Sequence, residues 1–398
     1  MYSRQPPLMG PSHMTTLRVG FLGWALLMCL LLPNLAIAQE EPAIPEKSST
    51  GEDSSKNKLK RAPSTVRIYR SPEERREAAA GTQLTPWLKF GAVVDIEKEW
   101  QTNNFKNGIK TVDNPDTELA IELGFEVTSI EWLEAELLFA IEDTGSRHYQ
   151  EVDEGFVGVN LDDFGAKVGL LYLPFGEFYS HFVTGPLVEF AQTRGPGVIL
   201  DYTLWDALEL SAYTFDGKVD KKGHSGKHQF DWGVAAEYVN EDESIRIGGG
   251  YISDLGEGDA EFFLDFNNTF QQHVPGWTAH GLIALPPFEF TGEIVHATEA
   301  IKEFDQGADK PLTYNLELAY YPSQFPWIQF ALRYEHSTEL EGEPQEIYGI
   351  GTSLRPLDNL SLSFEYLRGT FKNNFSLDDN DNVQTSYDLI AIAATFLF

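Results

Sequence analysis

Apolar residues recur at every second position through most of residues 87–398. In TELAIELGFEV, residues 117–127, five apolar side chains from Leu119 to Val127 share one face, and Glu122 and Glu126 lie on the other. WLEAELLFAIE, residues 132–142, repeats this arrangement after a short break. A period of two is typical of a β-strand whose two faces meet different surroundings. The two stretches predict an antiparallel hairpin with its carboxylates on a common face.

Short and long connections alternate along the chain. The tight turns are predicted at 129–130, 162–163, 205–206, 240–242, 286–287, 322–324 and 356–359. The longer, polar, Gly-rich connections are predicted near 101–115, 144–148, 176–195, 217–227, 254–275, 297–311, 337–345 and 372–384. Seven hairpins, with one strand at each end (87–100 and 385–398), give sixteen strands. Residues 259–270 are assigned to a long connection, since pairing them would change this count.

A soluble β-sandwich shows the same alternation, so other features must decide between a sandwich and a barrel. The alternation of short and long connections is one such feature. The final strand is another, because every second residue from Ile390 to Phe398 is apolar and the last is aromatic. Aromatic residues also stand beside the short turns, as an interfacial girdle requires: Trp87, Trp132, Phe164, Trp205, Phe288, Trp327 and Phe398. The sequence predicts an all-β fold, a transmembrane antiparallel β-barrel of the bacterial outer membrane over residues 84–398, with short periplasmic turns and long extracellular loops.

The first 83 residues predict no part of the barrel. Residues 1–38 combine an apolar stretch with a small-residue AIA ending, which is typical of a secretory signal peptide. Residues 39–83 are rich in Ser, Pro, Lys and Glu and predict a disordered periplasmic leader, with a short helix over 71–80. The single cysteine, Cys29, lies in the signal segment, so disulfides and Cys-ligated metals are excluded for the mature chain.

The charge is strongly acidic. The formal net charge is −32; residues 1–38 carry two arginines and no acid, and residues 39–83 carry nine bases against eight acids, so residues from 84 onward carry −35. Such a body repels phosphate, which excludes nucleic acid as a partner. We expect outer-membrane lipid and lipopolysaccharide as partners instead. No internal stretch reaches the roughly 20 apolar residues that a spanning helix needs.

A sixteen-stranded barrel is too wide for side chains to fill, so its lumen holds water unless something plugs it, and small solutes are expected to diffuse through. Inward carboxylates predict a preference for cations, although each alone is more simply interpreted as a solvated charge. The predicted inward carboxylates are Glu122, Glu126, Glu134, Glu136, Asp231, Glu237, Glu289, Glu293, Glu317, Glu335 and Glu365. The predicted inward cations are Lys89, Lys167, Arg246 and Arg333.

The connection GEFYSHFVTGPLVEFAQTRGPG, at about 176–197, is unusually apolar for an exposed loop. We interpret residues 176–196 as a loop folded into the barrel, with Glu189 and Arg194 as candidate constriction charges. A loop packed over the rim is the alternative.

The connection after residue 217 is the one basic segment, with Lys218, Lys221, Lys222 and Lys227, and is a possible anion-capture loop; a solvated loop is the simpler interpretation. Its two histidines, His224 and His228, have metal-binding spacing only on a helix, which a Gly-rich segment disfavours. The sequence predicts no cofactor, no metal site and no catalytic residues.

Two Gly-rich strand segments, IRIGGGYIS (245–253) and YGIGTSL (348–354), predict flat wall where a loop or a neighbouring molecule packs closely. Trimers are common among sixteen-stranded porins, so a homotrimer is the expected assembly if one forms, although no residue demands it.

Several segments resemble LbtU-type siderophore porins. The resemblance rests on YLPFGEFYSHFVTGPLVEFAQTR (172–194), AYTFDGK (212–218), HVPGWTAHGLIALPPFEFTGEIV (273–295), NLELAYYP (315–322), FALRYEH (330–336) and NLSLSFEYLRG (359–369). It covers residues 87–398 and implies a sixteen-stranded outer-membrane porin connected with siderophore-iron uptake. The family's ligand is an anionic polycarboxylate, which a lumen this acidic should repel.

Three other functions compete with a passive channel. An outer-membrane hydrolase needs Ser and His with an orienting partner, and His280 and His296 have no convincing Ser neighbour. An energised receptor is disfavoured because the 45-residue leader is too short for a plug domain. A structural or adhesive barrel is the third alternative, and a blocked lumen would distinguish it.

Overall fold

The computed structural model describes residues 81–113, 117–127, 132–143, 148–221, 230–258, 269–270, 272–304, 309–340, 342–371 and 383–398. The predicted signal peptide, the helix predicted over 71–80 and all but the last three residues of the predicted leader lie outside these residues. So do residues 259–268 and most of the basic connection after Lys221.

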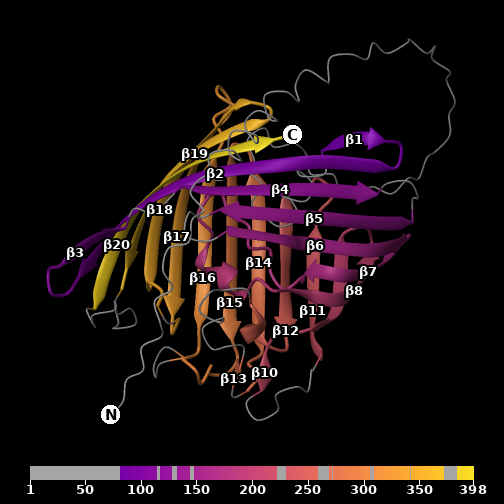
Figure 1. Ribbon diagram of the computed structural model, residues 1–398, viewed down its shortest axis with the longest axis horizontal. Coiled ribbons are helices and arrows are strands. Elements are labelled where there is room, and N and C mark those ends of the chain that lie inside the picture. The colour runs from indigo at the N-terminus through magenta and orange to yellow at the C-terminus, as the bar shows by residue number, and fades with distance from the viewer. Residues whose placement is uncertain are drawn as a thin grey trace, which may run out of the picture. The chain divides into compact units, whose positions relative to one another are not determined.

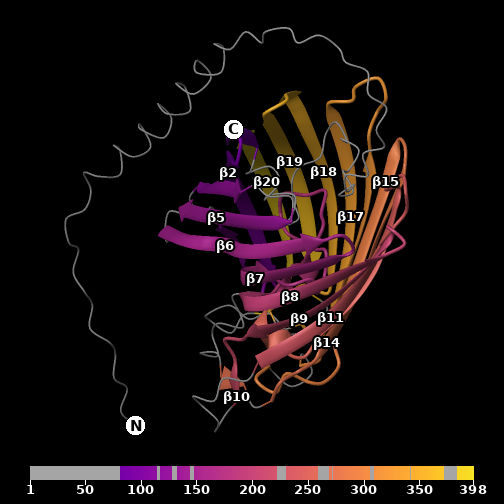
Figure 2. The same ribbon diagram turned by 90° about the vertical axis from the view of Figure 1, so that its right-hand side faces the viewer.

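Sixteen antiparallel strands form a closed barrel, as the sequence predicted (Figure 1, Figure 2). Each strand pairs with the next along the chain, and the first pairs with the last over Val93–Phe105 and Gln384–Leu397. The barrel strands are β2 (Leu88–Phe105), β4 (Glu118–Val127), β5 (Leu133–Asp143), β6 (His148–Leu161), β7 (Phe164–Tyr172), β8 (Arg194–Leu204), β9 (Leu208–Asp216), β11 (Phe230–Val239), β12 (Ile245–Ile252), β14 (Gly276–Leu285), β15 (Phe288–Ala297), β16 (Leu312–Tyr320), β17 (Ile328–Thr338), β18 (Glu346–Leu357), β19 (Leu360–Thr370) and β20 (Gln384–Leu397).

Four short strands and two 3₁₀ turns complete the described elements: β1 (Thr82–Thr85), β3 (Lys110–Asp113), β10 (Asp220–Lys221), β13 (Thr269–Phe270), η2 (Leu187–Ala191) and η3 (Leu255–Glu257). The prediction of a loop over 101–115 was partly wrong, because β2 pairs with β20 as far as Phe105 and β3 folds back onto β2. β13 pairs in parallel with β10 in a separate two-stranded sheet, so the barrel count of sixteen is unaffected.

The predicted tight turns join the barrel strands where the structure describes them. Asp162 and Asp163 alone connect β6 to β7, and Pro286 and Pro287 alone connect β14 to β15. Between β8 and β9, Trp205 and Asp206 both have positive φ, 56° and 54°. Two successive positive φ angles are typical of the turns whose twist matches that of a hairpin.

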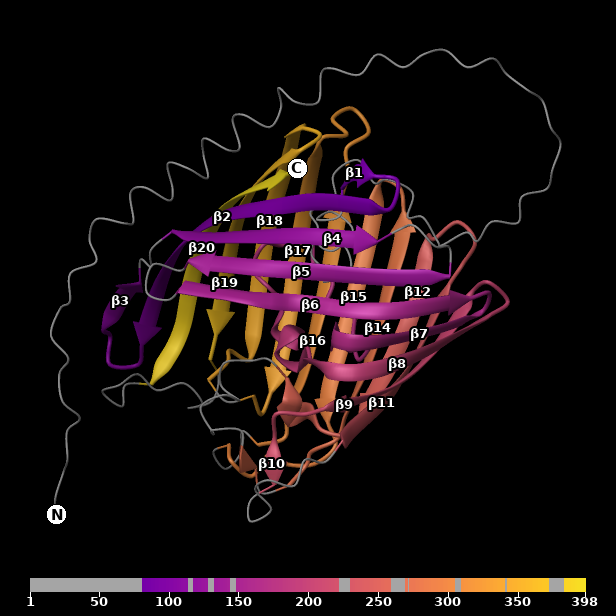
Figure 3. The same ribbon diagram turned by 45° about the vertical axis from the view of Figure 1, so that its right-hand side comes forward.

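The two faces of the wall differ as the alternation predicted. On β17, Phe330 and Leu332 are 48% and 54% exposed, while Arg333 and Glu335 on the other face are 3% and 1% exposed. On the first hairpin Phe125 is opposite Leu137 and Glu126 is opposite Glu136, so the carboxylates share one face as predicted. Because β2–β9 and β14–β19 form opposite sides of the closed barrel (Figure 3), the polar faces of these strands look toward each other across the interior.

Six of the seven aromatic residues predicted beside the short turns are exposed, Trp205 most of all at 83%, and Phe398 is half-buried. No helix within the described residues is long and apolar enough to cross a bilayer.

Charge on the outer face should therefore cost stability according to its depth. We expect Leu332→Arg, in the middle of β17, to lower the free energy of unfolding by about 2–4 kcal/mol and Leu285→Arg, next to the turn after β14, by about 0–1 kcal/mol. Urea unfolding from lipid vesicles measures both values. Equal costs at the two positions would contradict an apolar outer band.

Candidate functional site

The connection between β7 and β8, residues 173–193, is buried although it is a loop. Phe175, Phe182 and Val188 are at most 1% exposed. The loop joins two apolar clusters. One contains Phe178 and Val188 with Ile199, Phe215 and Val295, and the other surrounds Phe182.

The loop backbone is held by carboxylates that project from the strands. Six loop N–H groups donate to four glutamates: Glu177 (3.2 Å) and Phe178 (2.7 Å) to Glu293 of β15, His181 (2.6 Å) to Glu317 of β16, Leu187 (2.5 Å) to Glu335 of β17, and Val183 and Thr184 (3.1 Å) to Glu365 of β19. A buried N–H group needs a partner, and a hydrogen bond to a charged acceptor contributes about 1.5–3 kcal/mol. Because these acceptors lie within the strands rather than at the turns, the loop crosses the inner face well inside the strand ends.

The contact between Phe178 and Glu293 requires an unfavourable backbone conformation. Phe178 has φ 50°, in the left-handed region that side chains other than glycine rarely adopt. Its N–H donates to Glu293 and its ring is 4% exposed in the first apolar cluster. The hydrogen bond and the burial together hold a conformation that costs of order 1–3 kcal/mol.

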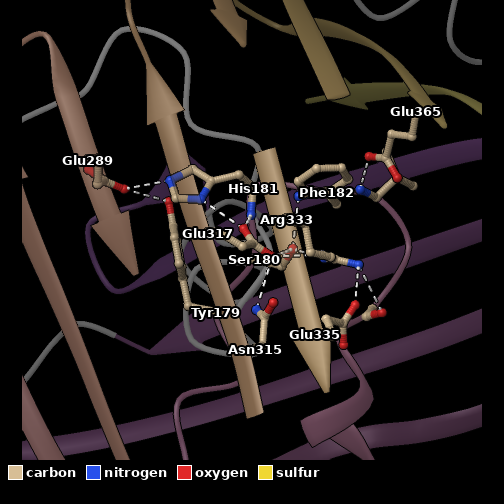
Figure 4. A network of polar contacts seen from close by, with 12 residues as sticks. Tyr179, Ser180, His181, Phe182, Glu289, Asn315, Glu317, Arg333, Glu335 and Glu365 are labelled. Atoms are coloured by element: carbon tan, nitrogen blue, oxygen red, sulfur yellow. Dashed lines mark hydrogen bonds and ion pairs between the residues drawn. The ribbon is translucent and has the colours of Figure 1, made fainter. Parts of the chain in front are cut away.

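At the centre of the loop, five charged side chains form a network that Figure 4 shows. His181 lies between two carboxylates, with Nδ1 2.9 Å from Glu317 and Nε2 3.0 Å from Glu289. Arg333 of β17 donates from Nε to Glu317 (2.9 Å) and lies 3.3 Å from Glu335. Ser180 donates to Glu317 (2.9 Å) and accepts from Arg333.

The geometry fixes the charge of His181. A carboxylate accepts hydrogen bonds, so both ring nitrogens must carry protons, and the imidazole is cationic. Burial works against the charged form, but the hydrogen bonds to Glu289 and Glu317 outweigh it and raise the pKa of His181 to about 9. With both nitrogens donating, His181 has no free lone pair and cannot act as a general base.

Glycines in the wall make room for the loop, as the two Gly-rich segments predicted. A Cβ at Gly250 of β12 would lie 2.6 Å from the backbone oxygen of Phe175. Gly349 and Gly351 of β18 lie beneath the ring of Phe182, whose Cε1 would be 3.0 and 3.1 Å from their added Cβ atoms. Arg333 covers the same ring, with its guanidinium carbon 4.3 Å from the centroid.

Several predicted pore-lining carboxylates are therefore not solvated charges. Glu293, Glu317, Glu335 and Glu365 are at most 6% exposed and hold the loop. The interpretation as solvated lumen charges is wrong for these residues, because the loop backbone supplies the donors that water would otherwise provide.

Three of the predicted inward cations form ion pairs with acids on the inner face. Lys89 contacts Glu126 (2.9 Å), Lys167 is 3.9 Å from Glu134, and Arg246 binds Glu177 (2.6 Å) and Glu237 (2.9 Å). Glu136 is half-buried on β5, and Glu122 on β4 is 7% exposed. Asp231 belongs to a separate cluster at the start of β11.

Of the two predicted constriction charges, Arg194 belongs to a strand rather than to the loop, and Glu189 stays a prediction. Arg194 begins β8 and binds Asp153 and Glu151 (2.9 Å) of β6, so it is part of the wall. Glu189 is exposed, and its carboxylate occupies the space that a side chain would need at position 185, which is a glycine. Of the four lysines of the basic loop, Lys218 is exposed, Lys221 is in β10, and Lys222 and Lys227 lie outside the described residues.

Sequence reasoning missed His181 as a functional residue. Its signal was present, because a single histidine in an apolar loop needs polar partners when it is buried. The sequence could not show which residues are these partners, since Glu289 and Glu317 lie more than 100 residues away along the chain.

We expect Glu317→Gln to lower the free energy of unfolding by about 3–5 kcal/mol, because Arg333 and His181 then lose a buried counter-charge. Glu126→Gln, which breaks the more exposed pair with Lys89, should cost about 1 kcal/mol or less. Urea unfolding measures both, and similar costs would contradict the central role of Glu317.

Gly250→Ala should also destabilise the protein, since the added methyl group meets the backbone oxygen of Phe175. Gly281→Ala on β14 is the control, because its nearest contact would be an ordinary 3.5 Å. We expect faster amide exchange in residues 174–188 for Gly250→Ala alone; unchanged exchange in that variant would refute the close packing.

No family model matches this chain. It is 27% identical over 223 residues to a UPF0422 protein of Coxiella burnetii, a match that covers 51% of this chain and 47% of the other, so the chain spans about half the length of that relative.

Solved structures with the same fold are outer-membrane proteins. OmpF of Salmonella typhi, in complex with daunomycin, has a TM-score of 0.56 at 12% identity and covers 79% of this chain and 98% of its own. An anion-selective porin from Comamonas acidovorans has a TM-score of 0.55 at 11% identity, covering 78% and 99%. The channel DcaP of Acinetobacter baumannii has a TM-score of 0.52 at 10% identity, covering 80% and 100%. The fold is that of the sixteen-stranded porins, and the closed barrel with its apolar outer face places this chain in the bacterial outer membrane.

Proposed function

We propose that this protein is a porin through which small solutes diffuse passively, and that the loop over residues 173–193 narrows its channel. The observation that carries the proposal is the hydrogen bonding of loop backbone to glutamates on β15, β16, β17 and β19. A loop held in this way occupies one side of the interior and leaves the side formed by β2, β4 and β5 facing it. Sixteen strands enclose more space than one such loop fills.

The side that faces the loop is acidic. Its inner face carries Glu122 and Glu126 on β4 and Glu134 and Glu136 on β5, and the register adds Asp95, Glu97 and Glu99 of β2. Lys89 and Lys167 offset two of these charges. Like-signed charges along a confined passage enrich counter-ions, so we propose a preference for cations.

The negative charge of this wall also affects which solutes can pass. The resemblance to siderophore porins suggests ferric siderophores, but a polycarboxylate chelate is anionic and would be repelled by this wall. We therefore propose small cationic and neutral solutes as the principal cargo.

A hydrolase is less well supported by the geometry. His181 lies beside Ser180, but both of its ring nitrogens are bound to carboxylates and Ser180 donates to Glu317. A serine hydrolase needs an imidazole that accepts the serine proton.

Planar-bilayer recording of the refolded chain under a salt gradient tests the proposal. We expect stepwise conductance with a cation-selective reversal potential. Glu126→Gln combined with Glu134→Gln should weaken the selectivity, because Lys89 and Lys167 then lose their counter-charges. Glu241→Gln, in the exposed turn after β11, should leave the selectivity unchanged.

Shortening the loop by replacing residues 177–190 with a few Gly and Ser residues should raise the single-channel conductance. Anion selectivity would contradict the assigned acidic wall. No conductance from a correctly folded barrel would overturn the channel function itself.

A further inference from the structure

A second polar cluster lies away from the loop network, where three neighbouring strands end. Asp231 is the second residue of β11, Asp254 follows β12, and His273 precedes β14. β12 pairs with both β11 and β14, so these three side chains come together although 42 residues separate Asp231 from His273.

The candidate ligand atoms of the three residues all lie within 4.8 Å of one another. His273 Nδ1 is 2.6 Å from Asp254 Oδ2 and 3.7 Å from Asp231 Oδ1. Two ligands that share a zinc-like ion at about 2.0–2.2 Å are separated by about 2.9–3.5 Å, depending on the coordination angle. The observed separations lie on either side of that range, so small rotations of the side chains bring them into it.

Each carboxylate holds one oxygen against neighbouring donors. Asp254 Oδ1 accepts from the N–H groups of Gly256 (3.0 Å) and Val274 (3.1 Å), and Asp231 Oδ1 accepts from Ser253 Oγ (2.8 Å). Asp254 Oδ2 lies against His273 Nδ1, whereas Asp231 Oδ2 is buried and makes no hydrogen bond within the described part of the chain.

The two carboxylates are well buried and the histidine is partly exposed. The side chains of Asp231 and Asp254 are 6% and 2% exposed, and that of His273 is 21% exposed. A buried polar atom without a partner costs about 1–3 kcal/mol, and more when it is charged. The unbonded Asp231 Oδ2 beside the pair of His273 and Asp254 therefore indicates a place for a cation that all three residues can reach.

We propose that Asp231, Asp254 and His273 bind one divalent transition-metal ion of the Zn²⁺ type. A set of two carboxylates and one imidazole favours such an ion over Ca²⁺ or Mg²⁺, whose protein ligands are oxygens. The ion would neutralise the two buried carboxylates and give Asp231 Oδ2 the partner that it lacks.

A fourth acid connects the site to a neighbouring loop. Glu257 of η3 is 3% exposed and accepts from the backbone N–H groups of Lys218 (2.5 Å) and Val219 (2.9 Å). A Cβ at Gly217 would lie 2.2 Å from Glu257 Oε1 and 2.9 Å from Asp231 Oδ2, so the two acids enclose that residue together. The proposed ion would therefore link the β12–β14 connection, which contains Asp254 and His273, to Asp231 of β11. Through Glu257, the same connection also binds the backbone after β9.

A group of similar composition elsewhere in the barrel serves as a comparison. Glu177, Glu237 and His280 also bring candidate ligand atoms within 4.8 Å of one another. Arg246 binds both of those glutamates, at 2.6 and 2.9 Å, and so already supplies the positive charge. We expect no metal ion there.

Calorimetric titration of Zn²⁺ into the refolded full chain, stripped of metal with a chelator, tests the proposal. We expect saturable binding that Asp231→Asn and His273→Gln each weaken by about 10–100-fold or more, since loss of even an outer-shell partner costs that much. His280→Gln should bind Zn²⁺ as the unchanged protein does. Heat-modifiable migration on gels verifies that each variant is folded.

A second measurement keeps the test independent of heat signals. Zn²⁺ should raise the urea midpoint of the unchanged protein and of His280→Gln, because a ligand that binds the folded state stabilises it. The shift should be absent in Asp231→Asn and His273→Gln. No saturable binding, or binding that both site variants retain in full, would overturn the proposal whether or not the barrel conducts ions.

Discussion

The interior of this barrel is organised by the need to give hydrogen-bond acceptors to a buried loop. A strand satisfies its backbone within the sheet, but a loop crossing the inner face leaves its N–H groups without partners unless side chains supply them. Glutamates spaced along β15, β16, β17 and β19 do so for residues 177–187. Two of these acids are also paired with positive charge: Glu317 with Arg333 and the doubly protonated His181, and Glu335 with Arg333.

That arrangement distinguishes two sides of the inner wall. Where the loop lies, glycines at positions 250, 349 and 351 leave room for its backbone and for the ring of Phe182. On the side formed by β2, β4 and β5, Lys89 and Lys167 lie beside two of the carboxylates. Glutamate thus anchors the loop on one side, and on the other it would supply the acidic lining on which the proposed cation preference rests.

The architecture could be predicted from the sequence because strand alternation and turn composition are local signals. The sixteen strands, their faces and most of the tight turns follow from these signals, and the Gly-rich segments correctly indicated close packing. The site was harder to predict. Alternation shows that Glu317 and Glu365 face inward, but cannot show that loop N–H groups meet them there. Arg194 was assigned to the constriction from its place in the loop, whereas its partner Asp153 lies on β6. Asp231 and His273 have no recognisable metal-binding spacing, because only the pairing of β11, β12 and β14 brings them together.

Phe182 belongs to the same buried apolar cluster as Leu389 and Ala391 of β20, the last strand of the barrel, although it lies in the connection after β7. About 200 residues of chain separate these partners, and contacts so distant in sequence make a fold slow to form. The complete cluster therefore exists only when the barrel is closed. If the loop is absent when β20 pairs with β2, the buried acids of four strands are enclosed without their donors. Closure of the barrel and placement of the loop are thus coupled, because the last strand completes the apolar cluster in which Phe182 packs.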